Sequence, residues 1–341
     1  MRRELSCLAP ASPRSLRVCE GVMPEPGRGE VLVRVQATSV NPIDVKRAAG
    51  YGQRLLGIKG AGRFPLVLGN DVMGRVEAVG PAVSQFATGQ RVFGLVGTGK
   101  RGGAHASHVA VSCAWLHLAP QDAEAAALAV LPYSFTTMWL AVRATRLSEE
   151  NGAGKRVLVH GAAGALGRLA LQMLSSWGSQ VTAICAAGKA DECLALGAHA
   201  AVERGPQAIA GLPTDFDAVL NFASWDDEPA LASRLGAGAL GHATTVHPLL
   251  GHFDRLGWLR GAWACRRDSK AMRAAVRQRS AQARYDWTIF RPEPDALAAL
   301  AAGVRSGRYA LPVGICVGLD QADVAFAHVA AGRYGRAVLQ P

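Results

Sequence analysis

The chain has 341 residues, half of them hydrophobic and 18% charged, which is typical of a compact protein with sizeable cores and not of a disordered one. This length favours two domains over one. No apolar run approaches the roughly 20 residues that a bilayer-spanning helix needs. The two arginines near the N-terminus are not followed by the apolar segment of a secretory signal. We therefore expect a protein without a membrane span, located in the cytoplasm.

The formal net charge of +11 raises the question of a nucleic-acid partner. Lysines are few and arginines are spread along the chain, so we predict no nucleic-acid partner. One denser cluster runs from Arg260 to Arg279. It is either a solvated helix face or a region that attracts an anionic ligand. The seven cysteines include no C-x-x-C pair, which indicates reduced, mostly buried thiols.

Residues 1 to about 120 are rich in Val, Gly and Pro and predict a β-rich, partly barrel-like domain. Short alternating or apolar runs recur there between turn signals, as expected for strands. The runs that carry this prediction are residues 31–35, 74–79, 90–94 and 108–111.

From about 121 to 284 the pattern changes to alternating strands and helices, which indicates a parallel doubly wound sheet. The expected strands are residues 157–159, 181–185, 200–202 and 218–220, and the expected helices include 166–177 and 191–196. Residues 285–341 return to mixed short elements. We expect them to fold back and complete the first domain.

The segment 156–174 places a strand, a glycine-rich turn and an amphipathic helix in direct succession. In a dinucleotide-binding turn, Gly164 would let the backbone approach a pyrophosphate and Gly167 would let the helix pack closely on the strand. The N–H groups at the helix start would then face the phosphates. The predicted cofactor-binding residues of this turn are Ala162, Ala163, Gly164, Ala165, Leu166 and Gly167.

The end of the second expected strand bears on the choice of nicotinamide cofactor. NAD sites usually place an acid there, about 20 residues beyond the turn, to hold the ribose hydroxyls. Here Ala186 follows the strand and no acid occurs before Asp191. Lys189 and Arg204 suit an additional 2′-phosphate, although both would also suit a solvated surface. We therefore predict NADPH as the cofactor in preference to NADH.

Several motifs together resemble the medium-chain dehydrogenase/reductase superfamily, and in particular its zinc-free quinone oxidoreductase branch. The motifs are a hairpin at 26–35, the N-x-x-D sequence Asn41-Pro42-Ile43-Asp44, the P-x-x-x-G-x-D-x-x-G-x-V segment at 65–76, and the stretch 131–139. Residues 41–52, 244–257 and 285–290 are similar to the reticulon-interacting mitochondrial oxidoreductases and their bacterial relatives. The resemblance implies a GroES-like catalytic domain (1–120, completed by 285–341) and a Rossmann domain (121–284).

The same motifs bear on metal binding. Zinc-dependent members of the superfamily carry Cys in the first motif and Gly-His-Glu in the second, where this chain has Asn41 and Gly69-Asn70-Asp71. The four-cysteine loop expected near residues 94–108 is absent from the sequence. His105 and His108 alone fall short of a zinc ligand set. We predict no metal.

Without zinc, the charge that develops on an acceptor oxygen must be met by hydrogen-bond donors or by protonation. Nicotinamide would supply the hydride. The resemblance implies that Asn41 is an amide donor and that Asp44 orients it or a nearby donor, with a structural turn as the alternative. Tyr51 is the predicted proton donor, and Lys46 is a further candidate.

The resemblance also implies roles near the cofactor for residues outside the turn. Thr137 would hold the phosphate or nicotinamide end, unless its hydroxyl bonds to its own helix. Val246 would lie under the nicotinamide, and Phe290 would line the substrate pocket, unless it belongs to the core. Arg336 replaces the usual Lys of the closing strand, which changes the geometry of that cation. Asn221 departs from the Asp usual at its position.

These observations predict an enzyme that transfers hydride from NADPH to a quinone or an activated enone, with a homodimer expected by resemblance. Two alternatives stay open. One is an enoyl-thioester reductase on the same fold, whose phosphorylated carrier would meet the basic cluster at 260–279. The other is a non-catalytic NADPH-binding sensor or adaptor, for which the departures at Asn221 and Arg336 leave room.

Overall fold

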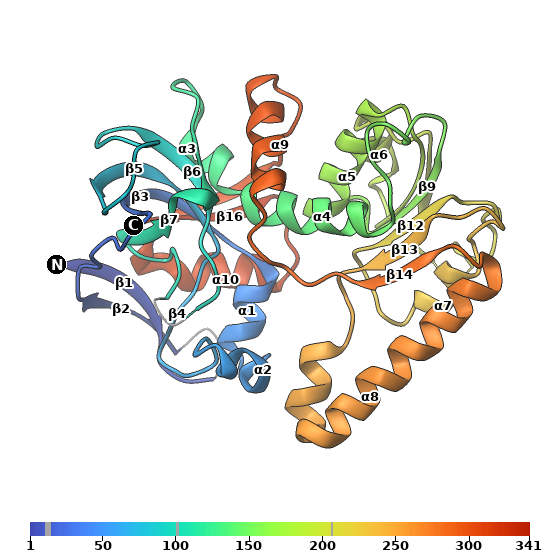
Figure 1. Cartoon of the computed structure of the whole chain (residues 1–341), viewed down its shortest axis with the longest axis horizontal. Helices are drawn as coiled ribbons and strands as arrows, with labels where there is room; N and C mark the ends of the chain where they lie inside the picture. Colours follow the sequence, from blue (N-terminus) through green and yellow to red (C-terminus); the bar gives the residue numbers. More distant parts are fainter. Residues whose placement is uncertain (11–14, 100–101, 206) are drawn as a thin grey trace. The chain divides into compact units, whose positions relative to one another are not determined.

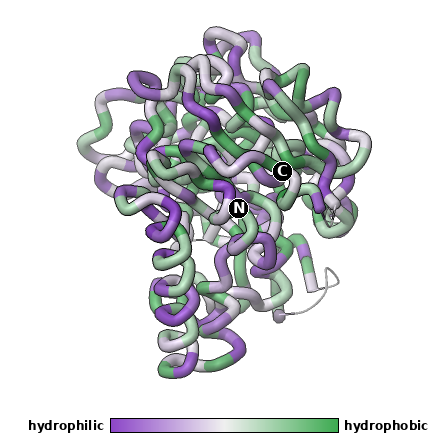
Figure 2. The backbone as a smooth tube through the Cα atoms, turned by 90° about the vertical axis from the view of Figure 1, so that its right-hand side faces the viewer, coloured by the Kyte–Doolittle hydropathy of each residue, from purple (hydrophilic) through white to green (hydrophobic). Residues whose placement is uncertain are grey.

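The computed structural model describes residues 1–10, 15–99, 102–205 and 207–341. The chain divides into two compact units, which Figure 1 shows in colours that follow the sequence. The first unit contains residues 1–133, 253–257 and 291–341, and the second contains 134–252 and 258–290. Figure 2 shows hydrophobic and hydrophilic residues interleaved along the backbone, as expected when each element buries only one of its sides.

The first unit is built mainly from strands. They are β1 (Arg2–Cys7), β2 (Leu16–Gly21), β3 (Glu30–Val40), β4 (Leu66–Val67), β5 (Asp71–Val79), β6 (Arg91–Leu95), β7 (His108–Ser112), β8 (Leu116–Leu118), β15 (Val313–Gly318) and β16 (Arg336–Gln340). Three of them form a sheet of order β2-β1-β4. The other seven form a sheet of order β15-β16-β3-β5-β6-β8, in which β7 also pairs with β3.

The long strand β3 organises this unit because it pairs with β5, β7 and β16 at once. Val33 and Val35 are buried while Arg34 between them is exposed, so one side of the strand faces the core. These valines pack with Val72, Val76 and Val92 in a closed apolar interior. The helical segments of this unit are α1 (Pro42–Ala48), α2 (Gln53–Ile58), a 3₁₀ turn η2 (Cys113–Trp115), α3 (Ala125–Ala129), α9 (Pro294–Arg305), a second 3₁₀ turn η3 (Leu319–Gln321) and α10 (Ala322–Ala330).

The second unit is a six-stranded parallel sheet in the order β11-β10-β9-β12-β13-β14. Its strands are β9 (Arg156–His160), β10 (Gln180–Cys185), β11 (Ala200–Glu203), β12 (Ala218–Asn221), β13 (Gly241–Thr244) and β14 (Arg284–Trp287). In chain order this is 3-2-1-4-5-6, so the direction of winding reverses between β9 and β12. Ligands of such sheets bind at the carboxyl ends of the strands beside this reversal.

Helices cover both faces of this sheet. They are α4 (Pro132–Ala144), α5 (Ala165–Ser176), α6 (Ala190–Ala195), α7 (Glu228–Ala232) and α8 (Leu249–Arg279). Helices α5 and α6 contact β9, β10 and β11. On the other face, Leu231 of α7 and Met272 and Val276 of α8 pack against Leu158 and Val219 of the strands. Helix α8 is interrupted at Gly257, whose φ of 75° is not helical.

One helical stretch among the described residues, Ala125–Ala144, has the length and hydropathy of a membrane-spanning helix. Of its most apolar window, 78% is buried inside the protein, as in a core helix.

The predicted fold class is confirmed: a GroES-like β-rich domain accompanies a doubly wound parallel sheet. The predicted division at 120/121 and 284/285 differs from the compact units, which change at 133/134 and 290/291. The second boundary is displaced because β14 pairs in parallel with β13 and so completes the six-stranded sheet. Four residues, Arg-Tyr-Asp-Trp, are too short a run to distinguish this strand from the elements after it.

We expect Gly167→Ala to lower the free energy of unfolding by about 1–3 kcal/mol, the usual cost of overpacking. An added Cβ at position 167 would lie 2.3 Å from the carbonyl oxygen of Gly161 and 2.4 Å from the Cα of Ala162, both on the backbone. Urea unfolding measures the effect. Gly164→Ala is the matched control, because its Cβ would approach nothing closer than 3.3 Å. Equal stability of the two variants would contradict the close approach of α5 to this turn.

Candidate functional site

The glycine-rich turn lies between β9 and α5, beside the reversal of strand order. The N–H groups of Gly161 and Ala162 both donate to the carbonyl oxygen of Ile184, at 2.9 and 3.0 Å, which anchors the turn to the end of β10. Gly161 has a φ of 82°, which glycine adopts without strain. Helix α5 then starts at Ala165, with Gly164 exposed in front of it. An anion at this helix start would meet N–H groups that have no partner within the helix.

Two cations predicted to bind a 2′-phosphate flank the end of the next strand. Lys189 pairs with Glu192, which also accepts from Arg168 at 2.7 Å. The backbone N–H of Arg204 donates to the carbonyl oxygen of Cys185, the last residue of β10, at 2.7 Å. The predicted Ala186 follows directly. Cations from α5, the start of α6 and the end of β11 therefore surround the turn after β10.

Asn221, at the end of β12, shapes the neighbouring edge of the site. It is fully buried, and its Oδ1 accepts from the N–H groups of Ala223 and Ser224 at 3.0 and 3.3 Å. A Cβ on Gly161 would lie 3.1 Å from the Cβ of Ala223, so this turn packs against the glycine-rich one. The departure from the usual Asp thus has a structural role that the sequence did not reveal.

Behind Asn221 lies a buried polar network that sequence reasoning missed. Glu228 accepts from Asn221 at 2.8 Å and from the Tyr285 hydroxyl at 3.2 Å, and it lies 3.0 Å from His242. Burial acts to raise the pKa of Glu228, but His242 and the hydrogen bonds hold it below its usual range. No motif marks these residues, because strands β12, β13 and β14 bring them together only in the folded sheet.

The remaining predicted residues of the second unit lie on different elements. Thr137 is buried on α4, Val246 lies just beyond β13 with its N–H 3.3 Å from Thr244 Oγ1, and Phe290 is half-buried beyond β14. Sequence reasoning did not single out His247, the residue after Val246. Its ring stacks on that of Trp287 with a centroid separation of 5.2 Å and an interplanar angle of 8°. Burial lowers the pKa of His247, which favours its neutral form.

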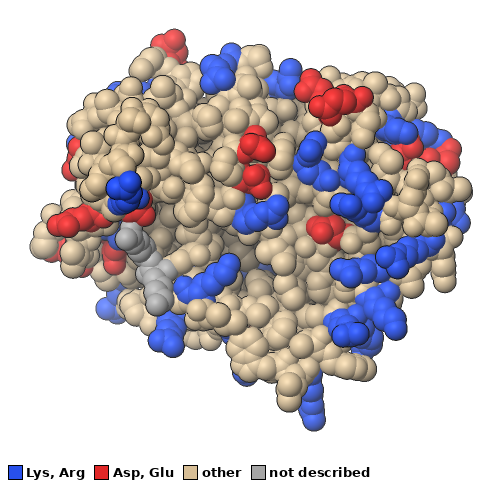
Figure 3. All heavy atoms as spheres, viewed as in Figure 1, with Lys and Arg blue, Asp and Glu red and all other residues tan. Residues whose placement is uncertain are grey.

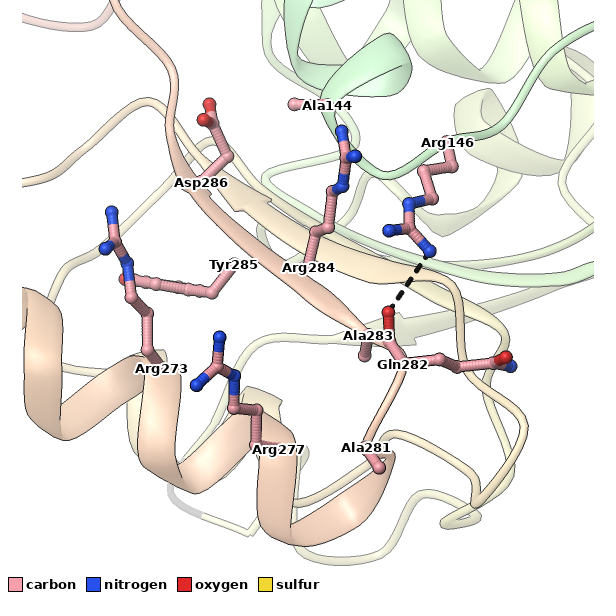
Figure 4. A pocket seen from close by; sticks show the side chains of 10 residues that line it. All are labelled: Ala144, Arg146, Arg273, Arg277, Ala281, Gln282, Ala283, Arg284, Tyr285 and Asp286. Atoms are coloured by element: carbon pink, nitrogen blue, oxygen red, sulfur yellow. Dashed lines mark hydrogen bonds between the residues drawn. The ribbon is translucent and has the colours of Figure 1, made fainter.

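A basic hollow of about 510 Å³ lies elsewhere in the second unit, between the C-terminal half of α8 and β14. Figure 3 shows the Lys and Arg side chains that gather over the right-hand part of one face, and Figure 4 shows the hollow itself. Its cations are Arg146, Arg273, Arg277 and Arg284. Residues 281–284 line it, at the amino end of β14, whereas the glycine-rich turn lies at the carboxyl end of β9. The hollow is therefore separate from the glycine-rich turn.

In the first unit, two side chains and one backbone N–H group donate to Asp71, the first residue of β5. Its Oδ2 accepts from Ser39 Oγ at 2.5 Å and from Asn41 Nδ2 at 2.8 Å, and its Oδ1 accepts from the Tyr133 N–H at 2.6 Å. The guanidinium of Arg336 donates to Asn41 Oδ1. Burial raises the pKa of Asp71 to about 6, although the hydrogen bonds and Arg336 act in the opposite direction.

The structure differs here from the predicted role of Asn41 as a substrate donor. Asn41 is fully buried, and its Nδ2 donates to Ser39 and Asp71. Asp44 is also fully buried and accepts from the N–H groups of Asn41 and Gly69, at 2.8 and 3.1 Å. Both side chains thus hold protein groups in place. Arg336 likewise contacts Asn41 and the Val40 carbonyl oxygen within the first unit.

Tyr51 lies in the turn before α2, next to the predicted Lys46, whose Nζ is 5.7 Å from the centroid of its ring. Sequence reasoning missed the residue that fixes this turn. Asp254 accepts from the backbone N–H groups of Gly52 at 2.5 Å and Arg54 at 3.2 Å. A carboxylate at these N–H groups stabilises the start of α2. Tyr51 therefore lies in a turn whose backbone is held by Asp254, a residue far along the chain.

No group of three or more His, Cys, Asp or Glu side chains within the described ranges is arranged to hold a metal ion. His105 is fully buried, with its Nε2 3.0 Å from the carbonyl oxygen of Ser39 and its ring edge-on to Phe326. His108 lies 3.0 Å from Glu77. The two histidines predicted not to form a metal site thus have separate partners.

The comparisons with known proteins agree with this architecture. Residues 27–121 match the alcohol dehydrogenase GroES-like domain. The chain is 30% identical over 319 residues to the mitochondrial reticulon-4-interacting protein 1 of Caenorhabditis elegans, covering 88% of this chain and 85% of the relative. It is 31% identical to the mitochondrial NAD(P)H oxidoreductase RTN4IP1 of Danio rerio, covering 82% and 75%. The quinone oxidoreductase of Coxiella burnetii has the same fold, with a TM-score of 0.82 at 20% identity, covering 100% of this chain and 99% of that one.

The chain belongs to the quinone oxidoreductase-like branch of the medium-chain dehydrogenase/reductase superfamily. Membership confirms the predicted family and the class of enzyme, an oxidoreductase. It also supports a nicotinamide cofactor. The two relatives are named as mitochondrial, so the cytoplasmic location stays a prediction.

We expect Asp71→Ala to lower the free energy of unfolding of this oxidoreductase by about 3–5 kcal/mol, the range seen when one partner of a buried charge pair is removed. The change leaves three donors unpaired and removes the carboxylate that offsets the charge of Arg336. Urea unfolding measures it. Asp320→Ala, which breaks the exposed pair with Arg3 at 2.8 Å, is the matched control and should cost at most about 1 kcal/mol.

The pH dependence of stability tests the pKa of Asp71 separately. Because that pKa is raised to about 6, the native protein binds a proton between about pH 7 and pH 5, while the unfolded chain does not. Stability must then rise as the pH falls through this window, by about 1 kcal/mol relative to Asp71→Asn. Parallel stability curves of the two proteins over this range would show that the Asp71 carboxyl does not titrate there.

Proposed function

We propose that this oxidoreductase transfers hydride from NADPH to a quinone or an activated enone without the help of zinc. The observation that carries the proposal is the glycine-rich turn at the reversal of the 3-2-1-4-5-6 sheet, directly before the N-terminus of α5. A pyrophosphate at that position meets the N–H groups of the helix start. The family membership and the named activity of the relatives support the reaction class.

The choice of NADPH rests on the turn after β10. The strand ends in Cys185, and Ala186 and Ala187 follow, so the strand itself carries no acid at the position that holds the ribose hydroxyls in NAD sites. The carboxylate of Glu203, from β11, accepts from the Gly188 N–H in this turn at 2.6 Å. Lys189 and Arg168 share the single carboxylate of Glu192. Arg204 is half-exposed and 3.7 Å from Asp227. A 2′-phosphate at this turn would be met by cations that the chain already holds close to the strand end.

The reaction needs a hydride, which nicotinamide supplies, and a proton for the reduced acceptor. We propose that the Tyr51 phenol donates this proton, with Lys46 beside its ring favouring the phenolate that remains. Asp254 fixes the turn that carries Tyr51. Asn41, Asp44, Asp71 and Arg336 act as positioning residues, since they hold one another.

The chemistry of the donor groups supports the proposed independence of zinc. The position where zinc-dependent members of the superfamily carry a thiolate is occupied by Asn41, whose amide donates to Ser39 and Asp71. The fully buried Asn70 donates to the carbonyl oxygen of Val96 at 2.9 Å. Amide groups engaged in this way are poor substitutes for the Cys and His ligands of zinc.

We further infer a homodimer, as the resemblance to the family implies. Light scattering of the purified protein at micromolar concentration measures it.

Replacing both Lys189 and Arg204 by Ala should raise the KM for NADPH about 10- to 100-fold while leaving that for NADH nearly unchanged, because only NADPH carries the 2′-phosphate. Steady-state kinetics with a 1,4-quinone measures the two constants. Lys155→Ala is the control, since Lys155 pairs with Asp217 at the amino end of β9. An equal change in both KM values would refute the phosphate contact.

Tyr51→Phe should lower kcat at least about 100-fold if the phenol is the general acid, and should leave the KM for NADPH unchanged. Tyr334→Phe, at an exposed tyrosine of the first unit, is the control. The assay uses protein freed of metal with a chelator, together with a quinone, an enone and an enoyl thioester. Full activity of Tyr51→Phe would remove the proton-donor role, and turnover of the thioester alone would favour the enoyl reductase.

A further inference from the structure

Helix α8 exposes large apolar side chains on the surface formed by the described residues. Beyond its break at Gly257, Leu259 is 88% exposed, Trp263 is 64% exposed and Trp258 is 47% exposed. Isolated exposed apolar residues are ordinary, but two tryptophans and a leucine within six positions form a patch. Such patches on a folded protein mark interaction surfaces.

The helix is amphipathic, and its outer side is the apolar and basic one. Its inner side buries Gly261, Ala264, Cys265, Met272 and Val276, the last two of them against the sheet. Leu259, Trp263, Arg266 and Lys270 follow the i, i+4, i+7, i+11 spacing, so they lie along one side of the helix. All four are exposed. The exposed side thus begins with bulky apolar groups and continues with cations.

The charge of this segment is strongly one-sided. Between residues 258 and 279 the only acid is Asp268, which already lies 2.7 Å from His252 and 2.8 Å from Arg267. The cations of the same segment are Arg260, Arg266, Arg267, Lys270, Arg273, Arg277 and Arg279. Arg267 also lies over the ring of Trp263, 5.4 Å from its centroid. The basic hollow beside β14 extends the positive surface from Arg273 and Arg277 to Arg146 and Arg284.

We propose that residues 258–270 of α8 dock this oxidoreductase on an anionic membrane surface. Helices that lie in the plane of a membrane interface combine Trp and Leu, which enter the acyl boundary, with Lys and Arg, which meet anionic headgroups. Trp is enriched at this depth because its ring is apolar and its N–H is polar. The inference rests on the helix surface alone, and it stands whatever the electron acceptor is.

We assign a lipid surface, and not a nucleic acid, as the partner of this helix face. Leu259 and Trp263 lie one turn apart just after the break at Gly257, and a phosphate backbone offers no apolar phase for the leucine. A second copy of the chain would bring the same cations together, face to face. Like charges at close range oppose that contact.

Sedimentation with vesicles tests the proposal on the full chain. The protein should pellet with vesicles of phosphatidylcholine and phosphatidylglycerol at low salt, and pellet much less with phosphatidylcholine alone or at high salt. Leu259→Gln combined with Trp263→Gln should weaken the partition at least about tenfold, since the two apolar groups that would enter the acyl boundary are lost. Arg266→Gln and Lys270→Gln should each weaken it on the order of fivefold.

Matched controls change the same chemistry elsewhere on the surface. Val22→Gln with Leu118→Gln removes exposed apolar groups of the first unit, and Arg17→Gln with Arg34→Gln removes two exposed cations there. Both controls should partition like the wild type. Equal loss in controls and helix variants would overturn the proposal, as would vesicle binding that ignores the anionic lipid. A smaller oligomer of the Leu259/Trp263 variant in sedimentation equilibrium would also overturn it, by assigning the helix face to a second copy.

Discussion

The glycine-rich turn depends on one close approach, that of helix α5 to the end of β9. Backbone atoms of residues 161 and 162 lie where a side chain at position 167 would have to be. Only glycine there lets the helix start directly behind the strand, with its first N–H groups aimed beyond the sheet edge. The carbonyl oxygen of Ile184 accepts from the N–H groups of the turn on one side. On the other side, Asn221 holds Ala223, which packs against Gly161. The stability of this sheet edge and the proposed binding of a pyrophosphate both rest on this contact.

The first unit depends on one buried group, the carboxylate of Asp71. Where a zinc-dependent relative would place metal ligands, this chain places Asp71 among hydrogen-bond donors, with the charge of Arg336 nearby. Removing such groups from water costs several kcal/mol, so they persist only while every partner is present. The network therefore holds this region of the first unit rigid. It also explains why Asn41 and Asp44, which a motif marks out, act on protein groups.

The sequence predicted what local patterns encode. The strand–turn–helix at 156–174, the alternating valines of β3 and the neutral end of β10 all follow from spacing within a few residues, and each corresponds to an element of the structure. The Glu228–His242 pair and the contact of Asp254 with Gly52 join residues far apart in the chain, so no local pattern signals them. Strand β14 lies beyond the predicted boundary at residue 284, because four residues carry too little periodicity to show that it pairs with β13. The motif marks Asn41 but not the partners of its side chain, Ser39 and Asp71, which only the fold brings to it.

Titration of NADPH into the Gly164→Val variant tests the central claim most directly. Gly164 is exposed, and its φ of −75° suits any residue, so the variant should fold like the wild type while its side chain fills the space that a pyrophosphate needs. Calorimetry should show that NADPH binds the wild type and binds the variant at least about 100-fold more weakly, the cost of losing the phosphate contacts of a helix start. Equal affinity of the two proteins for NADPH would show that this turn does not hold the cofactor.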